Sequence, residues 1–211
     1  MQNKSLARVQ FITHQNDRYS YYSSAIEALE CGLKFIQLRM KGASDKDVIS
    51  IAKRLRVECD KHNAILTIDD RIHLLQTNLF DGVHIGKQDI PTLKAKQITK
   101  DKYILGCTAN TIEDIVNAYN DGADYIGLGP FRFTTTKKNL STILGFEGYE
   151  KILKAINQKN ISIPIYAIGG IEVKDLQQMK DIGVFGVALS SVILNSSNTK
   201  QTIKEIINIY K

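Results

Sequence analysis

The chain has 211 residues, of which 43% are hydrophobic and 24% are charged, and its formal net charge is +6 at pH 7. This composition is typical of a globular protein with one core, and it excludes disordered and collagen-like chains. The lysines are spread along the chain and form no basic stripe or arm, so the charge favours a small phosphorylated ligand over nucleic acid.

Eight short runs of apolar and β-branched residues alternate with segments of helical periodicity along the whole chain. Continuous apolar runs of this length are typical of parallel strands that are covered on both faces. The predicted strands are residues 8–13, 35–39, 64–68, 82–85, 103–107, 125–127, 164–168 and 186–189.

Three of the segments between these runs carry an apolar stripe with i, i+3, i+4, i+7 spacing, which predicts helices packed on a sheet. The stripes are Val48, Ile51, Ala52, Leu55 and Cys59; Tyr149, Ile152, Leu153 and Ile156; and Ile203, Ile206, Ile207 and Tyr210. Ser44 with Asp47, and Thr111 with Asp114, have the spacing of capping boxes in which Asp replaces the usual Glu.

No linker or change of composition divides the chain, so we expect one α/β domain over residues 1–211, folded as a (β/α)8 TIM barrel. A doubly wound open sheet is the alternative. Two similar stretches, each a glycine turn that leads into a strand, start at Gly122 and Gly183 and favour the barrel.

The three cysteines, Cys31, Cys59 and Cys107, form no CxxC pair, so neither a zinc site nor a disulfide framework is indicated. This cysteine usage favours a reducing compartment, and we expect the cytoplasm. The N-terminal residues lack the pattern of a signal peptide, and no apolar run approaches the length of a membrane span. We therefore expect no membrane partner.

The second predicted strand ends in three polar residues, Gln37, Arg39 and Lys41. Chemistry in a (β/α)8 barrel lies where the strands end, and alternate residues of a strand share one face. An amide, a guanidinium and an ammonium group would therefore converge on a phosphorylated ligand at the mouth of the barrel. The alternative is a frayed polar strand end.

Carboxylates follow the next two strands: Asp69 and Asp70 after the third, and Asp89 after the fourth. Carboxylates at neighbouring strand ends can share Mg²⁺, which binds oxygen ligands and usually keeps several waters. For Asp70 the alternatives are an ion pair with Arg71 or a helix cap.

A second group of candidates follows the sixth, seventh and eighth strands. The long loop after the sixth strand is rich in hydroxyl groups and includes Thr134, Thr136 and Lys137, which is typical of a loop that covers a ligand, although a merely flexible surface loop is the alternative. Gly169-Gly170 and Ser190-Ser191 occupy the usual position of a barrel phosphate site. Two anion sites imply an enzyme with two phosphorylated substrates.

These motifs, in this order, resemble those of the thiamine phosphate synthase family over nearly the whole chain, from Val9 to Tyr210. The motifs that carry the resemblance are Gln37-x-Arg39-x-Lys41, Asp70-Arg71, Gly82-Val-His84-Ile-Gly86-x-x-Asp89, Gly122-Ala-Asp-Tyr-Ile-Gly-Leu-Gly-Pro130, Thr134-x-Thr136-Lys137, Gly145 and Ala167-Ile-Gly-Gly170-Ile. Each motif is short, but the ordered set is specific.

The resemblance implies a transferase that couples hydroxymethylpyrimidine diphosphate with hydroxyethylthiazole phosphate, with Mg²⁺ as cofactor, by a dissociative substitution. Arg39, Lys41 and Lys137 would be the catalytic cations on the diphosphate. Asp70 and Asp89 would bind Mg²⁺.

The resemblance also implies which residues contact the rest of the two substrates. Gln37 and Thr108 would contact the pyrimidine. The thiazole phosphate would be held by Thr134, Thr136, Gly170, Ser190 and Ser191. His84 lies in the motif of the fourth strand, where it either contacts substrate or supports the core.

Two residues depart from the family pattern. Thr108 stands where Ser is common and keeps the hydroxyl, whereas Asp69 stands where Asn is usual. A free carboxylate would repel a diphosphate. Asp69 would lie near the bound substrate, and we therefore expect it to join Asp70 and Asp89 at the metal. The alternative is that Asp69 pairs with Arg71 or a lysine.

Two other functions compete with the synthase. A thiazole tautomerase relative shares the fold but tends to lose the residues that Gln37 and Asp89 represent here, so their presence favours the synthase. A non-catalytic phosphate-binding barrel of the thiamine pathway would not need both cations and carboxylates. The sequence leaves a homo-oligomer open.

Overall fold

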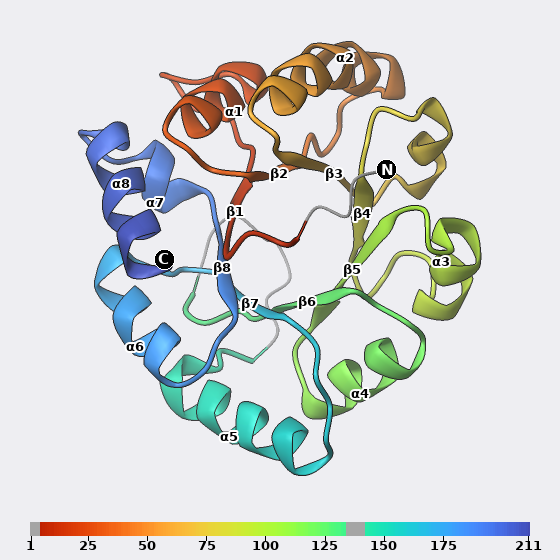
Figure 1. Cartoon of the computed structure of the whole chain (residues 1–211), viewed down its shortest axis with the longest axis vertical. Helices are drawn as coiled ribbons and strands as arrows, with labels where there is room; N and C mark the ends of the chain where they lie inside the picture. Colours follow the sequence, from red (N-terminus) through yellow and green to blue (C-terminus); the bar gives the residue numbers. More distant parts are fainter. Residues whose placement is uncertain (1–4, 134–141) are drawn as a thin grey trace.

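The computed structural model describes residues 5–133 and 142–211, and its parallel strands close into a barrel in sequence order, from β1 to β8. Figure 1 looks along this barrel, with the helices arranged as an outer ring. The strands are β1 Val9–Ile12, β2 Phe35–Leu38, β3 Ile65–Asp69, β4 Gly82–Ile85, β5 Ile104–Ala109, β6 Tyr125–Leu128, β7 Ile165–Ile168 and β8 Gly186–Leu189. Closure confirms the predicted (β/α)8 barrel and excludes the open sheet.

Every connection between consecutive strands passes through helical structure, as parallel pairing requires. The α-helices are α1 Tyr21–Glu30, α2 Asp45–Lys61, α3 Thr92–Thr99, α4 Ile112–Asn120, α5 Gly145–Gln158, α6 Leu176–Asp181, α7 Ser191–Leu194 and α8 Thr199–Ile209. Two 3₁₀ helices, η1 Ile72–Thr77 and η2 Val173–Asp175, lie between β3 and β4 and before α6. None of the helices in the described parts of the chain has both the length and the apolar character to cross a bilayer.

The predicted helical stripes pack inward, as expected. Val48, Ala52, Leu55 and Cys59 of α2 are fully buried, and the stripe of α5 is buried. The predicted caps also form: Ser44 accepts a hydrogen bond from the Asp47 N–H, and Thr111 with Asp114 makes a complete capping box. Strand ends differ from the predicted ones by at most two residues, because ladder hydrogen bonds with the neighbouring strands decide where pairing stops.

The amino end of the barrel interior is filled by three aromatic rings from β2, β6 and β7. The ring centroids of Phe35, Tyr125 and Tyr166 lie 5.3 to 5.8 Å apart in edge-to-face arrangements. Gly106 makes room for one of them, since a Cβ at that position would lie 2.1 Å from Tyr125 Cζ. At the base, the Tyr166 hydroxyl donates to Ala7 O at 2.6 Å. Within the described residues, aromatic packing therefore fills the amino end of the barrel interior.

We predict that Phe35→Ala lowers the free energy of unfolding by about 3–5 kcal/mol, because it leaves a cavity at the centre of this aromatic cluster. Equilibrium urea unfolding measures the change. Phe133→Ala is the matched control, since the Phe133 side chain is 64% exposed, and it should cost about 0.5 kcal/mol or less. Similar losses in both variants would show that the cluster does not anchor the barrel.

Candidate active site

Three charged side chains that follow β2, β3 and β4 meet at the carboxyl end of the barrel. Lys41 Nζ lies 3.5 Å from Asp70 Oδ2, and the Asp70 carboxyl group lies close enough to Asp89 to raise the pKa of Asp89. Asp70 has φ +63, a left-handed conformation that Asp tolerates better than most residues. The Gly86 N–H donates to Asp89 Oδ2 at 2.7 Å. The structure thus brings together the two carboxylates that the sequence marks as metal ligands and one of the expected cations.

The contact between Asp70 and Asp89 raises the free energy of the doubly ionised pair, and the pKa of Asp89 reflects this. Partial burial is the largest cause that raises the pKa of Asp89, and the hydrogen bond and charge of Asp70 raise it further. The Gly86 N–H and Lys41 act in the opposite direction without cancelling the rise. Two adjacent carboxylates whose repulsion is only partly offset form an oxygen donor set that suits a hard divalent cation.

Asp69 makes contacts quite different from those of Asp70. Its Oδ1 accepts a hydrogen bond from Gln37 Nε2 at 2.6 Å, and its Oδ2 lies 3.3 Å from Arg39 Nε. The Arg39 and Asp69 side chains are only 14% and 10% exposed, so water screens this ion pair weakly. Over residues 5–133 and 142–211, no three His, Cys, Asp or Glu side chains are grouped so that they could hold a metal ion. The structure thus gives Asp69 a charged partner, Arg39, that the sequence did not indicate, and the expected place of Asp69 at the metal stays a prediction.

Arg71 holds the segment that carries Lys41. Its guanidinium donates to Ala43 O at 2.6 Å, to Met40 O at 3.3 Å and to the Asp45 carboxylate. These bonds tie the start of η1 to the loop between β2 and α2. The contacts of Arg71 therefore shape the neighbouring loop, and the alternative in which Arg71 pairs with Asp70 or Asp69 is not what the structure shows.

His84 and Thr108 lie side by side on β4 and β5, further inside the mouth. His84 is 8% exposed, and its Nε2 lies 3.0 Å from Thr108 Oγ1. Its Nδ1 lies 3.1 Å from the hydroxyl of Tyr125. Gly127 leaves space for the ring, because a Cβ there would lie 3.0 Å from His84 Cε1. His84 is thus a core residue in direct contact with a candidate substrate-binding hydroxyl.

The ends of β7 and β8 form the other side of the mouth. Gly169 and Gly170 have φ values of +93 and +70, which residues with a Cβ rarely adopt. At Gly170 a Cβ would also lie 2.9 Å from Arg132 Cβ, so this glycine admits the segment that follows β6. Ser190 directly precedes the four-residue helix α7. The structure therefore puts the expected glycine and hydroxyl groups at adjacent strand ends.

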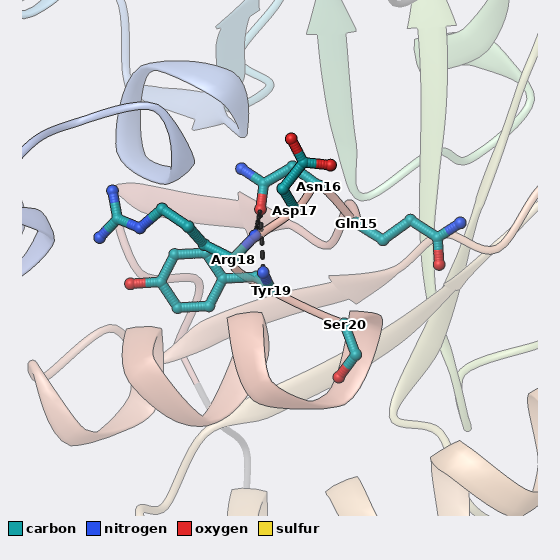
Figure 2. Close-up of a pocket in the computed structure, with 6 residues that line it drawn as sticks. All are labelled: Gln15, Asn16, Asp17, Arg18, Tyr19 and Ser20. Atoms are coloured by element: carbon teal, nitrogen blue, oxygen red, sulfur yellow. Dashed lines mark hydrogen bonds between the residues drawn. The ribbon is translucent and has the colours of Figure 1, made fainter.

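A cavity of about 490 Å³ lies beside β1 and is lined by residues 15–20 (Figure 2). Asn16 shapes this loop, because its Oδ1 accepts hydrogen bonds from the backbone N–H groups of Arg18 and Tyr19. Arg18 also donates to Ser196 O at 2.7 Å, and Asn16 to Leu194 O at 3.4 Å. The loop after β1 is thereby attached to the segment after α7, near the expected thiazole side of the mouth.

Three candidate residues, Thr134, Thr136 and Lys137, lie outside the described residues, as does the rest of 134–141. Their expected contacts with diphosphate and phosphate stay predictions.

Comparison with known proteins agrees with this geometry. The family model described as thiamine monophosphate synthase matches residues 9–193. The chain belongs to the thiamine monophosphate synthase family. A thiamine-phosphate synthase of Bacteroides thetaiotaomicron is 48% identical over 204 residues, which cover 97% of this chain and 98% of that protein. One from Flavobacterium johnsoniae is 39% identical and covers 94% of each chain.

A solved structure supports the same assignment. The thiamine phosphate pyrophosphorylase of Pyrococcus furiosus superposes with a TM-score of 0.83 at 30% identity, covering 96% of this chain and 95% of that one. The family resemblance stated from the motifs is thus confirmed.

Two residues that hold the mouth in place in this member of the thiamine monophosphate synthase family, Arg132 and Asp175, were not among the candidates from the sequence. Arg132 donates to both carboxylate oxygens of Asp175, at 2.9 and 3.0 Å, and to Gly170 O at 2.6 Å. Asp175 is 4% exposed. A bidentate pair of this kind holds the segment after β6 against the glycines after β7. The two residues are 43 positions apart, so no sequence pattern indicates that they pair. Only the position of Arg132 in the long loop after the sixth strand indicated a role near the site.

The raised pKa of Asp89 predicts the sign of a stability change. In the folded state, ionised Asp89 is disfavoured at every pH above its raised pKa, and this penalty disappears as the pH falls toward the unfolded value. Asp89→Asn removes the charge and keeps an acceptor for the Gly86 N–H. Without divalent cations it should raise the thermal midpoint at pH 8, and the gain should vanish near about pH 4.

Asp114→Asn is the control, and its thermal midpoint should change in the opposite direction. Burial raises the pKa of Asp114, but hydrogen bonds from Lys87 and the Asn110 N–H outweigh burial, so the net pKa is lowered. A lowered pKa contributes stability above the unfolded pKa that is lost as the pH falls. The Asp114 variant should therefore melt lower than the unmodified protein at pH 8. A fall in the midpoint for both variants would contradict the repulsion between Asp70 and Asp89.

Proposed function

We propose that the chain is a thiamine phosphate synthase that couples hydroxymethylpyrimidine diphosphate with hydroxyethylthiazole phosphate, releasing diphosphate. The observation that carries the proposal is the arrangement at the mouth: Lys41, after β2, lies beside the carboxylates that follow β3 and β4, and Arg39 lies beside Asp69 at the end of β3. The glycine and hydroxyl groups at the ends of β7 and β8 lie across from them. This arrangement suits two anionic substrates, one of which needs a metal ion.

Mg²⁺ fits the residues that are present. Asp70 and Asp89 supply oxygen ligands only, and their mutual repulsion falls when a cation lies between them. One or two carboxylates are the usual protein share of a Mg²⁺ site whose other ligands are phosphate oxygens and water. When bound, Mg²⁺ would neutralise the charge that gathers on the diphosphate.

The protein's own contribution is charge stabilisation and positioning. We propose that Arg39 and Lys41 bind the diphosphate while its bond to the pyrimidine methylene carbon breaks and the electron pair leaves with the diphosphate oxygen. Lys137 would act with them. The ring nitrogen of the thiazole then donates its lone pair to the methylene cation, forming the new bond. Neither step requires a covalent nucleophile on the protein, in keeping with the residues at the mouth.

Arg39 would take part while bound to Asp69. The contact to Asp69 uses Nε, so the terminal nitrogens of the guanidinium stay available for a second anion. The same carboxylate accepts from Gln37 Nε2, which orients the side-chain amide that is proposed to contact the pyrimidine. The partly buried Asp69 carboxylate thereby orients both Arg39 and Gln37, the two side chains that are proposed to bind substrate.

The first functional prediction is the reaction itself. Purified protein should form thiamine phosphate and diphosphate only when both substrates and Mg²⁺ are present, as measured by chromatography of the products. Asp70→Ala should abolish most of the rate, whereas Asp101→Ala, which removes a fully exposed carboxylate, should leave it unchanged. Tautomerisation of the thiazole without coupling would reject the synthase and support the tautomerase alternative.

A second prediction concerns Asp69, the departure from the family pattern. Asp69→Asn removes a negative charge near the diphosphate and releases Arg39. We expect KM for the pyrimidine diphosphate to fall about tenfold, which corresponds to roughly 1.4 kcal/mol. Because Arg39, and not the metal pair, offsets Asp69, the Mg²⁺ concentration for half-maximal rate should stay unchanged. A higher Mg²⁺ requirement would show instead that Asp69 takes part in binding the metal.

A further inference from the structure

A chain of four polar side chains runs through the barrel interior from β1 to β5. Gln10 Nε2 donates to Tyr125 Oη at 3.1 Å, Tyr125 Oη lies 3.1 Å from His84 Nδ1, and His84 Nε2 lies 3.0 Å from Thr108 Oγ1. Gln10 and Tyr125 are 1% and 0% exposed, and Thr108 is half-buried at the mouth. The chain therefore connects the closed core to the surface that receives substrate.

The direction of each hydrogen bond follows from the donors available. Burial raises the pKa of the Tyr125 phenol, so the phenol keeps its proton. Within the described residues, Tyr125 Oη has two hydrogen-bonding neighbours, Gln10 Nε2 and His84 Nδ1. The Gln10 amide nitrogen can only donate, so the Tyr125 hydrogen is directed to His84 Nδ1.

This arrangement determines the tautomer of His84. Since Nδ1 accepts from Tyr125, the neutral imidazole carries its proton on Nε2 and donates it to Thr108 Oγ1. A proton on Nδ1 would leave the Tyr125 hydrogen without an acceptor among its neighbours in the described residues. The Thr108 hydroxyl accepts from His84, so its own hydrogen is left to point toward the mouth.

We propose that Gln10, Tyr125 and His84 are positioning residues that make Thr108 an obligatory hydrogen-bond donor to the substrate. The inference rests on the proposed function and refines it. The substrate atom over Thr108 must be an acceptor, such as an unprotonated ring nitrogen of the pyrimidine. A ring turned so that its exocyclic amine faced Thr108 would meet a donor with a donor, and this selects one orientation of the pyrimidine.

The tautomer can be tested without substrate. In ¹⁵N-histidine-labelled protein at neutral pH, a two-bond ¹H–¹⁵N spectrum should show His84 protonated on Nε2 alone, with the signal assigned by its loss in His84→Gln. Tyr125→Phe removes the donor to Nδ1 and should give a mixture of tautomers. Protonation of His84 on Nδ1 in the unmodified protein would overturn the proposal, whether or not the protein is an active synthase.

Tyr166→Phe is the matched control. Tyr166 belongs to the same aromatic cluster, but its hydroxyl donates to Ala7 O at the opposite end of the barrel. Both variants lose one buried hydroxyl, so a purely structural effect should be similar in the two. Only Tyr125→Phe should change the His84 spectrum, and only it should raise KM for the pyrimidine diphosphate, by about tenfold, the scale of one hydrogen bond. Equal effects of the two variants would overturn the proposal.

Substitutions of Thr108 test the last link independently of how well the Tyr125 variant folds. Thr108→Ser keeps the hydroxyl and should preserve KM for the pyrimidine diphosphate within about twofold, whereas Thr108→Val should raise it about tenfold. KM for the thiazole phosphate should change in neither. Equal KM values in the Ser and Val variants would show that the hydroxyl does not donate to substrate. Failure of the unmodified protein to couple the substrates would reject the proposed function but not the tautomer.

Discussion

Closure of eight parallel strands sends every second side chain into one narrow interior, and the rest of the molecule follows from how that interior is filled. Phe35, Tyr125 and Tyr166 occupy its amino end in mutual edge-to-face contact. The rings exclude water there, so polar inward side chains must find partners in the protein itself, either one another or backbone carbonyls. Tyr125 takes part in both layers, because its ring packs below and its hydroxyl bonds to His84 above. Tyr125 therefore connects the aromatic cluster at the amino end with the polar residues at the mouth.

The carboxylates at the mouth differ in how far neighbouring cations offset their charge, and this difference bears on where a metal ion would bind. Asp69 forms an ion pair with Arg39 and accepts a hydrogen bond from Gln37, in a place that water reaches poorly. Asp70 and Asp89 are compensated only in part, by Lys41 at the open rim. A carboxylate pair with residual repulsion binds a cation more favourably than a neutralised one. Asp69 and Asp70, which are neighbours at the end of β3, thus have different proposed roles: Asp69 orients other side chains, and Asp70 belongs to the candidate metal site.

Fold and family could be predicted from the sequence because their signals are local. Apolar runs of strand length, helical stripes and capping residues depend on neighbours within a few positions, and the barrel they indicate is the one observed. The order of the short motifs was enough to name the family, since each motif follows a strand and strand ends gather on one face. The grouping of Lys41 with Asp70 and Asp89 followed from the same rule.

The sequence indicated which residues follow the ends of the strands, whereas the contacts between their side chains depend on the tertiary structure. Asp69 and Asp70 are adjacent in the chain, yet strand alternation and the left-handed backbone of Asp70 give them different partners. Arg71 bonds to Asp45 and the loop after β2, not to the carboxylates beside it. The pairs Arg132–Asp175 and Gln10–Tyr125 join residues 43 and 115 positions apart. No local pattern encodes such pairs, because side-chain contacts across a closed barrel depend on register and on the space that neighbouring side chains leave.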